Sequence, residues 1–243
     1  MSEITEFLGK ALDAKVTERV YDDIASPGFK ELGKIGADAA KTARLFLAPL
    51  QIAALFQERF ERFLRKADSR IPEDRRIEVR AEIVGPAVES MRYLEEGSSL
   101  WKMFEELLLK SADRDSVSLV HPSFVHIVKQ LTPDEANMLF KLRQGEFKIV
   151  DRMELNRALN RFENRVVESS TIPNEELLNP EAVSIYYAHL ESLSLVSWPV
   201  TKQTPIVDAG VQTGTRRDSN IQLTEFGILF VTACLPPGGA STK

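Results

Sequence analysis

Histidines and carboxylates near the middle of the chain are the first residues whose types and spacing suggest chemistry. His121 and His126 lie about one helical turn apart, and Asp113 and Asp115 come shortly before them. Imidazole nitrogens and carboxylate oxygens are ligands that zinc accepts. A histidine directly before a proline also suits the start of a helix, where His126 would lie on the helix surface. Because the ligand count is low, we predict no metal site and no cofactor.

Paired acidic residues in the same region raise the question of acid and base catalysis. The pairs are Glu95-Glu96 and Glu105-Glu106. Adjacent residues on a helix point in different directions, so these pairs fit a solvated face better than a catalytic dyad. The sequence contains no glycine-rich phosphate loop, serine nucleophile elbow or HExxH motif. We therefore predict no catalytic residues, and an enzyme with an unfamiliar site stays the alternative.

Three basic residues in the last third of the chain suggest contact with nucleic acid. Lys202, Arg216 and Arg217 lie in or beside the polar segment 203–220, which is rich in turn-forming residues and predicts a long mobile loop. In a winged helix such a loop reaches the phosphates. The helix predicted before it, 180–194, has no lysine or arginine, so it offers a poor surface for reading bases.

The elements that would position these side chains follow from hydrophobic spacing and helix punctuation. Two successive helices are predicted within 117–142, the first opened by His121-Pro122 and the second by Thr132 as N-cap. Pro133 at the first helical position and Glu135 three residues after the cap complete a capping box. A short strand at 195–200 and a closing helix at 225–235, capped by Thr224, complete the winged-helix order.

The N-terminal part shows mostly helical spacing. Helices are predicted over 3–25, over 29–66 with a break near Pro49, and over 99–112. Segment 77–83 instead alternates apolar with charged residues, which predicts an extended strand ended by Gly85-Pro86.

Residues 147–167 allow two interpretations. Residues 147–150 are typical of a short strand. Leu155, Leu159, Phe162 and Val166 also lie at helical spacing, with arginines on the other side, so a helix over 152–167 is the alternative.

Composition limits the classes of protein that this chain can belong to. The 243 residues are 43% hydrophobic and carry a formal net charge of −5, which argues against a uniformly basic nucleic-acid-binding surface. Cys234 is the one cysteine, so no intramolecular disulfide can form. The N-terminal residues lack the pattern of a secretory signal, and no apolar run reaches the length of a membrane span. We expect a cytoplasmic protein.

A central block resembles the bacterial abortive-infection alpha family. The residues that carry the resemblance run from Gly85-Pro86 through Asp113 to His121-Pro122-Ser123-Phe124, with the downstream segment LTEFGILFVTACL. The resemblance implies a role in limiting phage growth. It implies no catalytic residues.

Taken together, these patterns predict a mainly α fold, with a helical region at 1–116, a winged-helix-like region with a small β-hairpin at 117–238 and a disordered tail at 239–243. The predicted function is phage defence through contact with a host or phage protein. Two alternatives stay open: a winged-helix regulator that binds DNA, and an effector that perturbs membranes through the amphipathic segment 34–66. The oligomeric state is not predicted.

Overall fold

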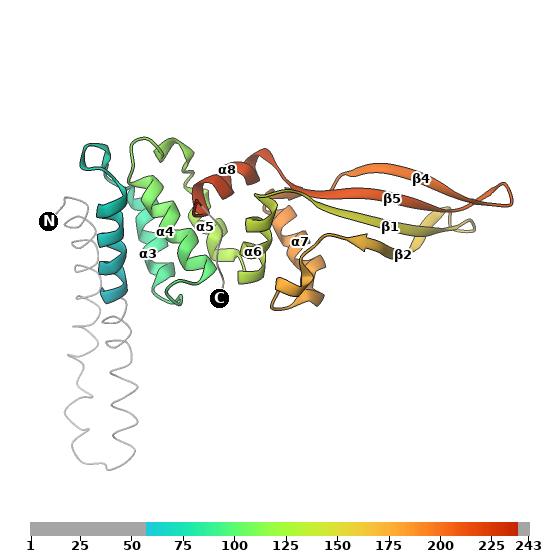
Figure 1. Cartoon of the computed structure of the whole chain (residues 1–243), viewed down its shortest axis with the longest axis horizontal. Helices are drawn as coiled ribbons and strands as arrows, with labels where there is room; N and C mark the ends of the chain where they lie inside the picture. Colours follow the sequence, from blue (N-terminus) through green and yellow to red (C-terminus); the bar gives the residue numbers. More distant parts are fainter. Residues whose placement is uncertain (1–56, 238–243) are drawn as a thin grey trace, which may run out of the picture. The chain divides into compact units, whose positions relative to one another are not determined.

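The computed structural model describes residues 57–237 of the chain (Figure 1). Residues 57–70 are helical, and the named helices that follow are α3 (Ala81–Met91), α4 (Ser99–Ser111), α5 (Ser123–Gln130), α6 (Pro133–Leu142), α7 (Val183–Ser192) and α8 (Glu225–Cys234). The strands are β1 (Phe147–Asn156), β2 (Arg161–Ser170), β3 (Val196–Ser197), β4 (Val200–Asp208) and β5 (Val211–Leu223). The helix predicted at 3–25, most of segment 34–66 and the tail 239–243 lie outside the described residues.

The described chain divides into two compact units. One comprises residues 57–96 and 108–118, and the other comprises 97–107 and 119–237. The boundary between residues 116 and 117 that the sequence suggested stays a prediction.

The strand predicted at 77–83 does not form in the first unit: residues 77–80 have no regular secondary structure, and residues 81–83 belong to a helix. Helix α3 begins at Ala81, and its buried residues Ile83, Val84, Ala87 and Met91 recur at helical spacing. Only an isolated bridge between Arg76 and Asp113 is strand-like in this region. The strand prediction was wrong because Ile83 fits both the two-residue period of a strand and the 3.6-residue period of a helix. Burial of Ile83 on one face of α3 decided between them.

The second unit contains an antiparallel sheet, which corrects the prediction of a mainly α chain with one small hairpin. Within residues 57–237 five strands join in the order β2-β1-β5-β3, and β4 also pairs with β5. Strand β1 pairs with β5 from Phe147–Ile221 to Glu154–Gly214. The two hairpins, β1–β2 and β4–β5, thus lie side by side in one long sheet (Figure 1).

Both hairpins occupy segments for which the sequence suggested other structures. Strands β4 and β5 meet at Ala209 and Gly210, whose φ angles of 47° and 79° are those of a two-residue type I′ turn. The predicted loop over 203–220 is therefore regular strand. The helical alternative for 152–167 is also wrong, because those residues form the β1–β2 hairpin, with Asn160 at φ 48° in its turn.

The helix caps predicted from the sequence are present in the second unit. Thr132 Oγ1 accepts a hydrogen bond from Glu135 N at 3.2 Å, and Glu135 Oε2 accepts one from Thr132 N at 2.7 Å, which confirms the capping box. Thr224 Oγ1 likewise accepts a hydrogen bond from Gly227 N at 2.9 Å and caps α8. Helices α5 and α8 pack through aromatic rings, since the Phe124 and Phe230 centroids lie 5.3 Å apart.

Candidate functional site

A buried carboxylate holds two arginines where the sheet meets α7. Asp151 on β1 is 1% exposed. Arg165 on β2 donates its Nε to Asp151 Oδ2 at 2.9 Å. Arg217 on β5 donates its Nε to Oδ1 at 2.9 Å and its Nη2 to Oδ2 at 3.2 Å. Strands β2 and β5 flank β1, so the two guanidinium groups reach the same carboxylate from opposite sides.

The Asp151 carboxylate stays ionised at neutral pH. Burial opposes its ionisation, but the hydrogen bonds from Arg217 and Arg165 outweigh this effect, so the pKa of Asp151 lies below its ordinary value of 3.8. One negative charge therefore faces two positive charges, and the cluster keeps one positive charge in excess.

Aromatic residues form the wall beside these arginines. The Arg165 guanidinium lies 4.9 Å from the centre of the Trp198 ring. Trp198 Nε1 donates to Ser219 Oγ at 2.7 Å, and the Tyr187 ring meets Trp198 edge to face at 4.7 Å. Together with Val200 these residues line a cavity of about 290 Å³. An ionic cluster, an indole and a hydroxyl thus converge on one polar cavity, which we call the Asp151 cavity.

The sheet separates Arg217 from Lys202 and Arg216, the other two residues predicted to contact nucleic acid. Arg216 and Arg217 are neighbours on β5, so their side chains point to opposite faces. Arg216 donates its Nε to Glu168 Oε2 at 2.8 Å and lies 3.4 Å from Asp218 Oδ1. Lys202 is in register with Asp218 on β5. Arg216 and Arg217 are thus both paired with carboxylates.

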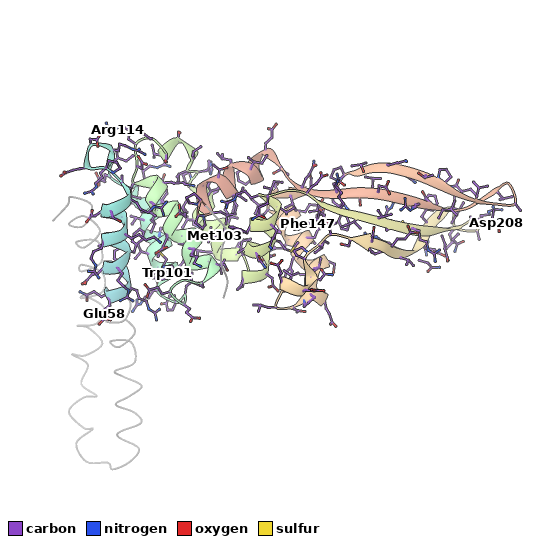
Figure 2. The ribbon with its side chains drawn as sticks, viewed as in Figure 1. Glu58, Trp101, Met103, Arg114, Phe147 and Asp208 are labelled. Atoms are coloured by element: carbon purple, nitrogen blue, oxygen red, sulfur yellow. The ribbon has the colours of Figure 1, made fainter. Side chains whose placement is uncertain are left out.

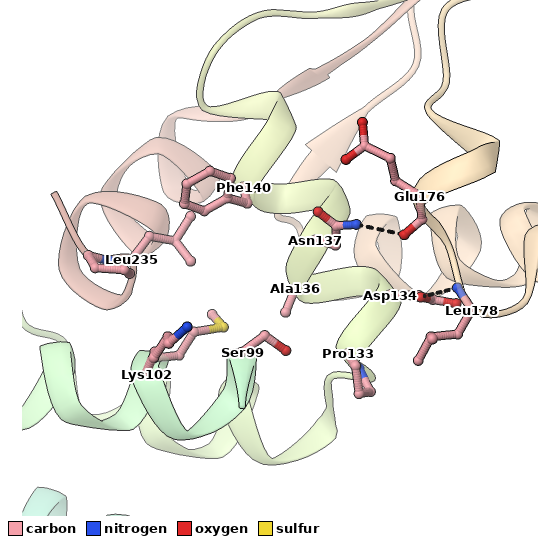
Figure 3. Close-up of a pocket in the computed structure, with 12 residues that line it drawn as sticks. Ser99, Lys102, Pro133, Asp134, Ala136, Asn137, Phe140, Glu176, Leu178 and Leu235 are labelled. Atoms are coloured by element: carbon pink, nitrogen blue, oxygen red, sulfur yellow. Dashed lines mark hydrogen bonds between the residues drawn. The ribbon is translucent and has the colours of Figure 1, made fainter. Parts of the chain in front are cut away.

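A second, more apolar cavity of about 160 Å³ lies between α4, α6 and the chain after α8 (Figure 3). Phe140, Ala136 and Leu235 contribute apolar walls. Its rim is fixed by hydrogen bonds from Asn137 Nδ2 to Glu176 O at 3.1 Å and from Leu178 N to Asp134 Oδ1 at 2.8 Å.

Two buried carboxylates on α6 hold α7. Glu135 Oε1 lies 2.6 Å from His189 Nδ1, and Asp134 Oδ2 accepts a hydrogen bond from the Tyr186 hydroxyl at 2.9 Å. Glu135 is also half of the capping box, and Asp134 also accepts from the backbone of residues 178 and 179. Because these oxygens serve the backbone and α7, the arrangement ties α6 to α7 and presents no nucleophile.

The residues of the central block that resembles a known family serve local structure. Gly85 and Pro86 lie within α3. In the same unit, the Asp113 carboxylate binds the Arg75 guanidinium and accepts a hydrogen bond from Asp115 N at 3.1 Å.

In the second unit, Pro122 precedes α5, and His121 Nδ1 accepts a hydrogen bond from Ser123 N at 3.1 Å. The Phe124 side chain is fully buried. His126 lies on the exposed side of α5. Within residues 57–237 no group of three or more histidine, cysteine or carboxylate side chains is arranged to hold a metal ion.

Three exposed aliphatic side chains lie at the end of the sheet that carries the two turns. Leu159, in the β1–β2 turn, is 58% exposed, and Val207 and Val211, beside the β4–β5 turn, are 59% and 43% exposed. Arg157 Nη2 donates to Gln212 O at 2.8 Å, which joins the two turns. We call Leu159, Val207 and Val211 the sheet tip. Figure 2 labels Asp208 at this end and Phe147 where β1 leaves the helices.

Sequence reasoning missed the Asp151 cavity and the sheet tip because both depend on strand pairing. One sequence signal for β1 was the alternation of Phe147, Ile149 and Asp151 with other residues. These three side chains are the buried ones at the start of the strand. The two-residue turn at Ala209-Gly210 between alternating segments was a second signal.

Comparison with known proteins gives one match. The profile of the abortive infection alpha family covers residues 52–234. The chain belongs to this family. Membership confirms the resemblance seen in the central block, and the family's name suggests a role in abortive infection, a form of phage defence. No curated protein and no solved structure matches the chain. Within the described residues, no helix is long and apolar enough to cross a membrane.

Proposed function

We propose that this member of the abortive infection alpha family limits phage growth by binding a protein partner through its sheet tip. The observation that carries the proposal is the exposure of Leu159, Val207 and Val211 at the joined ends of two hairpins. Val207 pairs with Gln212 and Val211 with Asp208, so the two valines lie on opposite faces of the hairpin and a partner would have to contact both faces of the sheet tip.

The sheet holds these side chains in a fixed arrangement. Strands β1 and β5 pair from the helices outward to Glu154, and the Arg157–Gln212 hydrogen bond continues the link into the turns. A partner would therefore meet a preorganised surface and lose little entropy in ordering it. Covering three half-exposed aliphatic side chains contributes about 1 kcal/mol each, or about 3 kcal/mol in all. Loss of that contribution would weaken binding by about a hundredfold.

The surroundings of the basic residues favour a protein partner over DNA. Arg216 is paired with Glu168, Arg217 lines the Asp151 cavity, and helix α7 carries no lysine or arginine. Duplex binding needs several cations arranged along an exposed surface.

A membrane partner has less support than a protein. Phe60, Phe63 and Leu64, which belong to the described end of segment 34–66, are buried. Beside the sheet tip, Arg157 donates to Gln212 O and Arg161 to Glu163, so these arginines are already engaged and attract anionic lipid weakly.

The test compares a sheet-tip variant with a matched surface variant. The triple substitution Leu159→Ser, Val207→Thr and Val211→Thr removes the exposed aliphatic groups while keeping strand-compatible residues at the two valines. Ile185→Ser is the control, because Ile185 is 68% exposed on α7, away from the turns. Bacteria producing each variant are infected, and phage yield and host survival are measured side by side.

We expect the wild-type chain and Ile185→Ser to restrict phage equally, and the triple variant to lose restriction. The triple variant should keep the circular dichroism spectrum of the wild-type chain and be present in the cells in the same amount. Full restriction by the folded triple variant would overturn the proposal. Sedimentation of the wild-type chain with anionic liposomes, lost in the triple variant, would replace the protein partner with a membrane surface.

A further inference from the structure

The two arginines at the Asp151 cavity have donors that the cluster does not use. Arg165 gives only Nε to Asp151, and Arg217 gives Nε and Nη2. Arg165 Nη1 and Nη2 and Arg217 Nη1 have no hydrogen-bond acceptor among the described residues. Both arginines line the cavity. The cavity therefore has charged donors and one excess positive charge available for a ligand.

Asp151 acts as a positioning residue for these donors. A buried carboxylate that fixes the Nε edge of each guanidinium group leaves the terminal nitrogens in a defined direction. The Trp198 ring beside Arg165 and the Trp198–Ser219 hydrogen bond further restrict the Arg165 side chain. An anion would meet donors that are already arranged, so little side-chain entropy would be lost on binding.

The donor arrangement suits one class of anion. Guanidinium groups bind phosphate and carboxylate through charge-assisted hydrogen bonds. A carboxylate offers two oxygens in one plane, as Asp151 does here, whereas a phosphate offers at least three oxygens in several directions and carries up to two negative charges. Here two arginines arrive from strands on opposite sides of β1, so their terminal nitrogens approach from two directions. We propose that the Asp151 cavity binds the phosphate group of a small phosphorylated molecule.

The cavity dimensions agree with this ligand class. A volume of about 290 Å³ holds a phosphate group with part of the molecule that carries it. Val200 and the aromatic residues Tyr187 and Trp198 give that part an apolar wall. This site is separate from the sheet tip, so it does not rest on the proposed function. Its test reads ligand binding directly.

The experiment titrates the purified full chain with inorganic phosphate and, separately, with AMP as a small phosphate ester. Potassium chloride keeps the ionic strength constant. Trp198 fluorescence is the readout, because the ring contacts Arg165, while Trp101, the other tryptophan, is buried and gives a constant background. We expect a saturable change with at least one of the two probes.

Neighbouring arginines provide a matched pair of variants. Arg217→Gln removes a cavity donor, and Arg216→Gln removes an equally charged residue from the opposite face of the same strand. We expect Arg217→Gln to weaken binding by at least about tenfold, as for loss of a charged hydrogen bond, and Arg216→Gln to bind as the wild-type chain does.

Val200→Glu places a carboxylate on the cavity wall and keeps every residue of the Asp151 cluster, so it decides the question if Arg217→Gln fails to fold. We expect Val200→Glu to weaken binding by at least about tenfold through like-charge repulsion while the chain keeps its wild-type circular dichroism spectrum. A wild-type chain that responds to neither probe would overturn the proposal and leave the cluster a purely structural ion pair. Unchanged binding by folded Val200→Glu would also overturn it.

Discussion

Substituting Gly227 with alanine tests how closely α8 packs on the chain before β3. A Cβ atom at residue 227 would lie 1.9 Å from Leu195 O and 2.9 Å from Leu195 C. That carbonyl oxygen also accepts a hydrogen bond from Thr224 N at 3.1 Å, and the Leu195 side chain is fully buried. Backbone on both sides of the contact is therefore held in place, and the new methyl group cannot be accommodated by a side-chain rotation.

The size of the effect follows from two opposing contributions. Alanine favours a helix over glycine by about 1 kcal/mol. Relief of the clash requires α8 to move by about 1.5 Å, from 1.9 Å to an ordinary contact distance, and such overpacking costs about 3 kcal/mol at the upper end of its usual range. This movement would disturb the packing of Phe230 on Phe124. We expect Gly227→Ala to lower the free energy of unfolding by about 2 kcal/mol.

Urea unfolding followed by circular dichroism measures this change, which corresponds to a fall in the midpoint of about 1 M. Gly145→Ala is the control, since no atom lies within 4 Å of a Cβ at that position and its φ angle is not in the left-handed region. The control should change the free energy of unfolding by less than about 0.5 kcal/mol. A Gly227→Ala chain as stable as the wild type would refute the inferred contact between α8 and Leu195.

Three further predictions concern polar groups that form hydrogen bonds in the structure. Asp151→Asn leaves two guanidinium groups without a counter-charge, and because both arginines keep some contact with water we expect a loss of about 3 kcal/mol in urea unfolding, at the low end for a broken buried ion pair. Hydrogen bonds or ion pairs hold the pKa values of Asp113, Asp134 and Asp151 below their ordinary 3.8. The three ionised carboxylates therefore stabilise the fold above pH 3.8, and this stabilisation is lost as the pH falls through their lower pKa values in the folded chain. Urea midpoints should thus stay level from about pH 7 to 5 and fall below about pH 4, and a flat profile into that range would contradict the prediction. Thr132→Ala removes one half of the α6 capping box and should cost about 1 kcal/mol in thermal or urea unfolding, whereas Thr132→Ser should keep most of it.

Sequence determined the helices and caps whose interactions are local. Thr132, Pro133 and Glu135 lie within four residues of one another, so their capping geometry is encoded without reference to the rest of the chain. The same holds for Thr224 and Gly227 at the start of α8. The central block also carried the family membership, because a family profile depends on residue order alone.

Tertiary structure decided the sheet and the cavity at its base. Residues 152–167 fit both a helical and an extended period, and the pairing of β1 with β5, more than sixty residues away, selects the strand. Asp151 is one of many acidic residues in the sequence, and only this pairing buries it between Arg165 and Arg217. Long-range hydrogen bonding and burial depend on contacts that no local pattern encodes, so the cluster, the cavity and the sheet tip appear only once the strands are assembled.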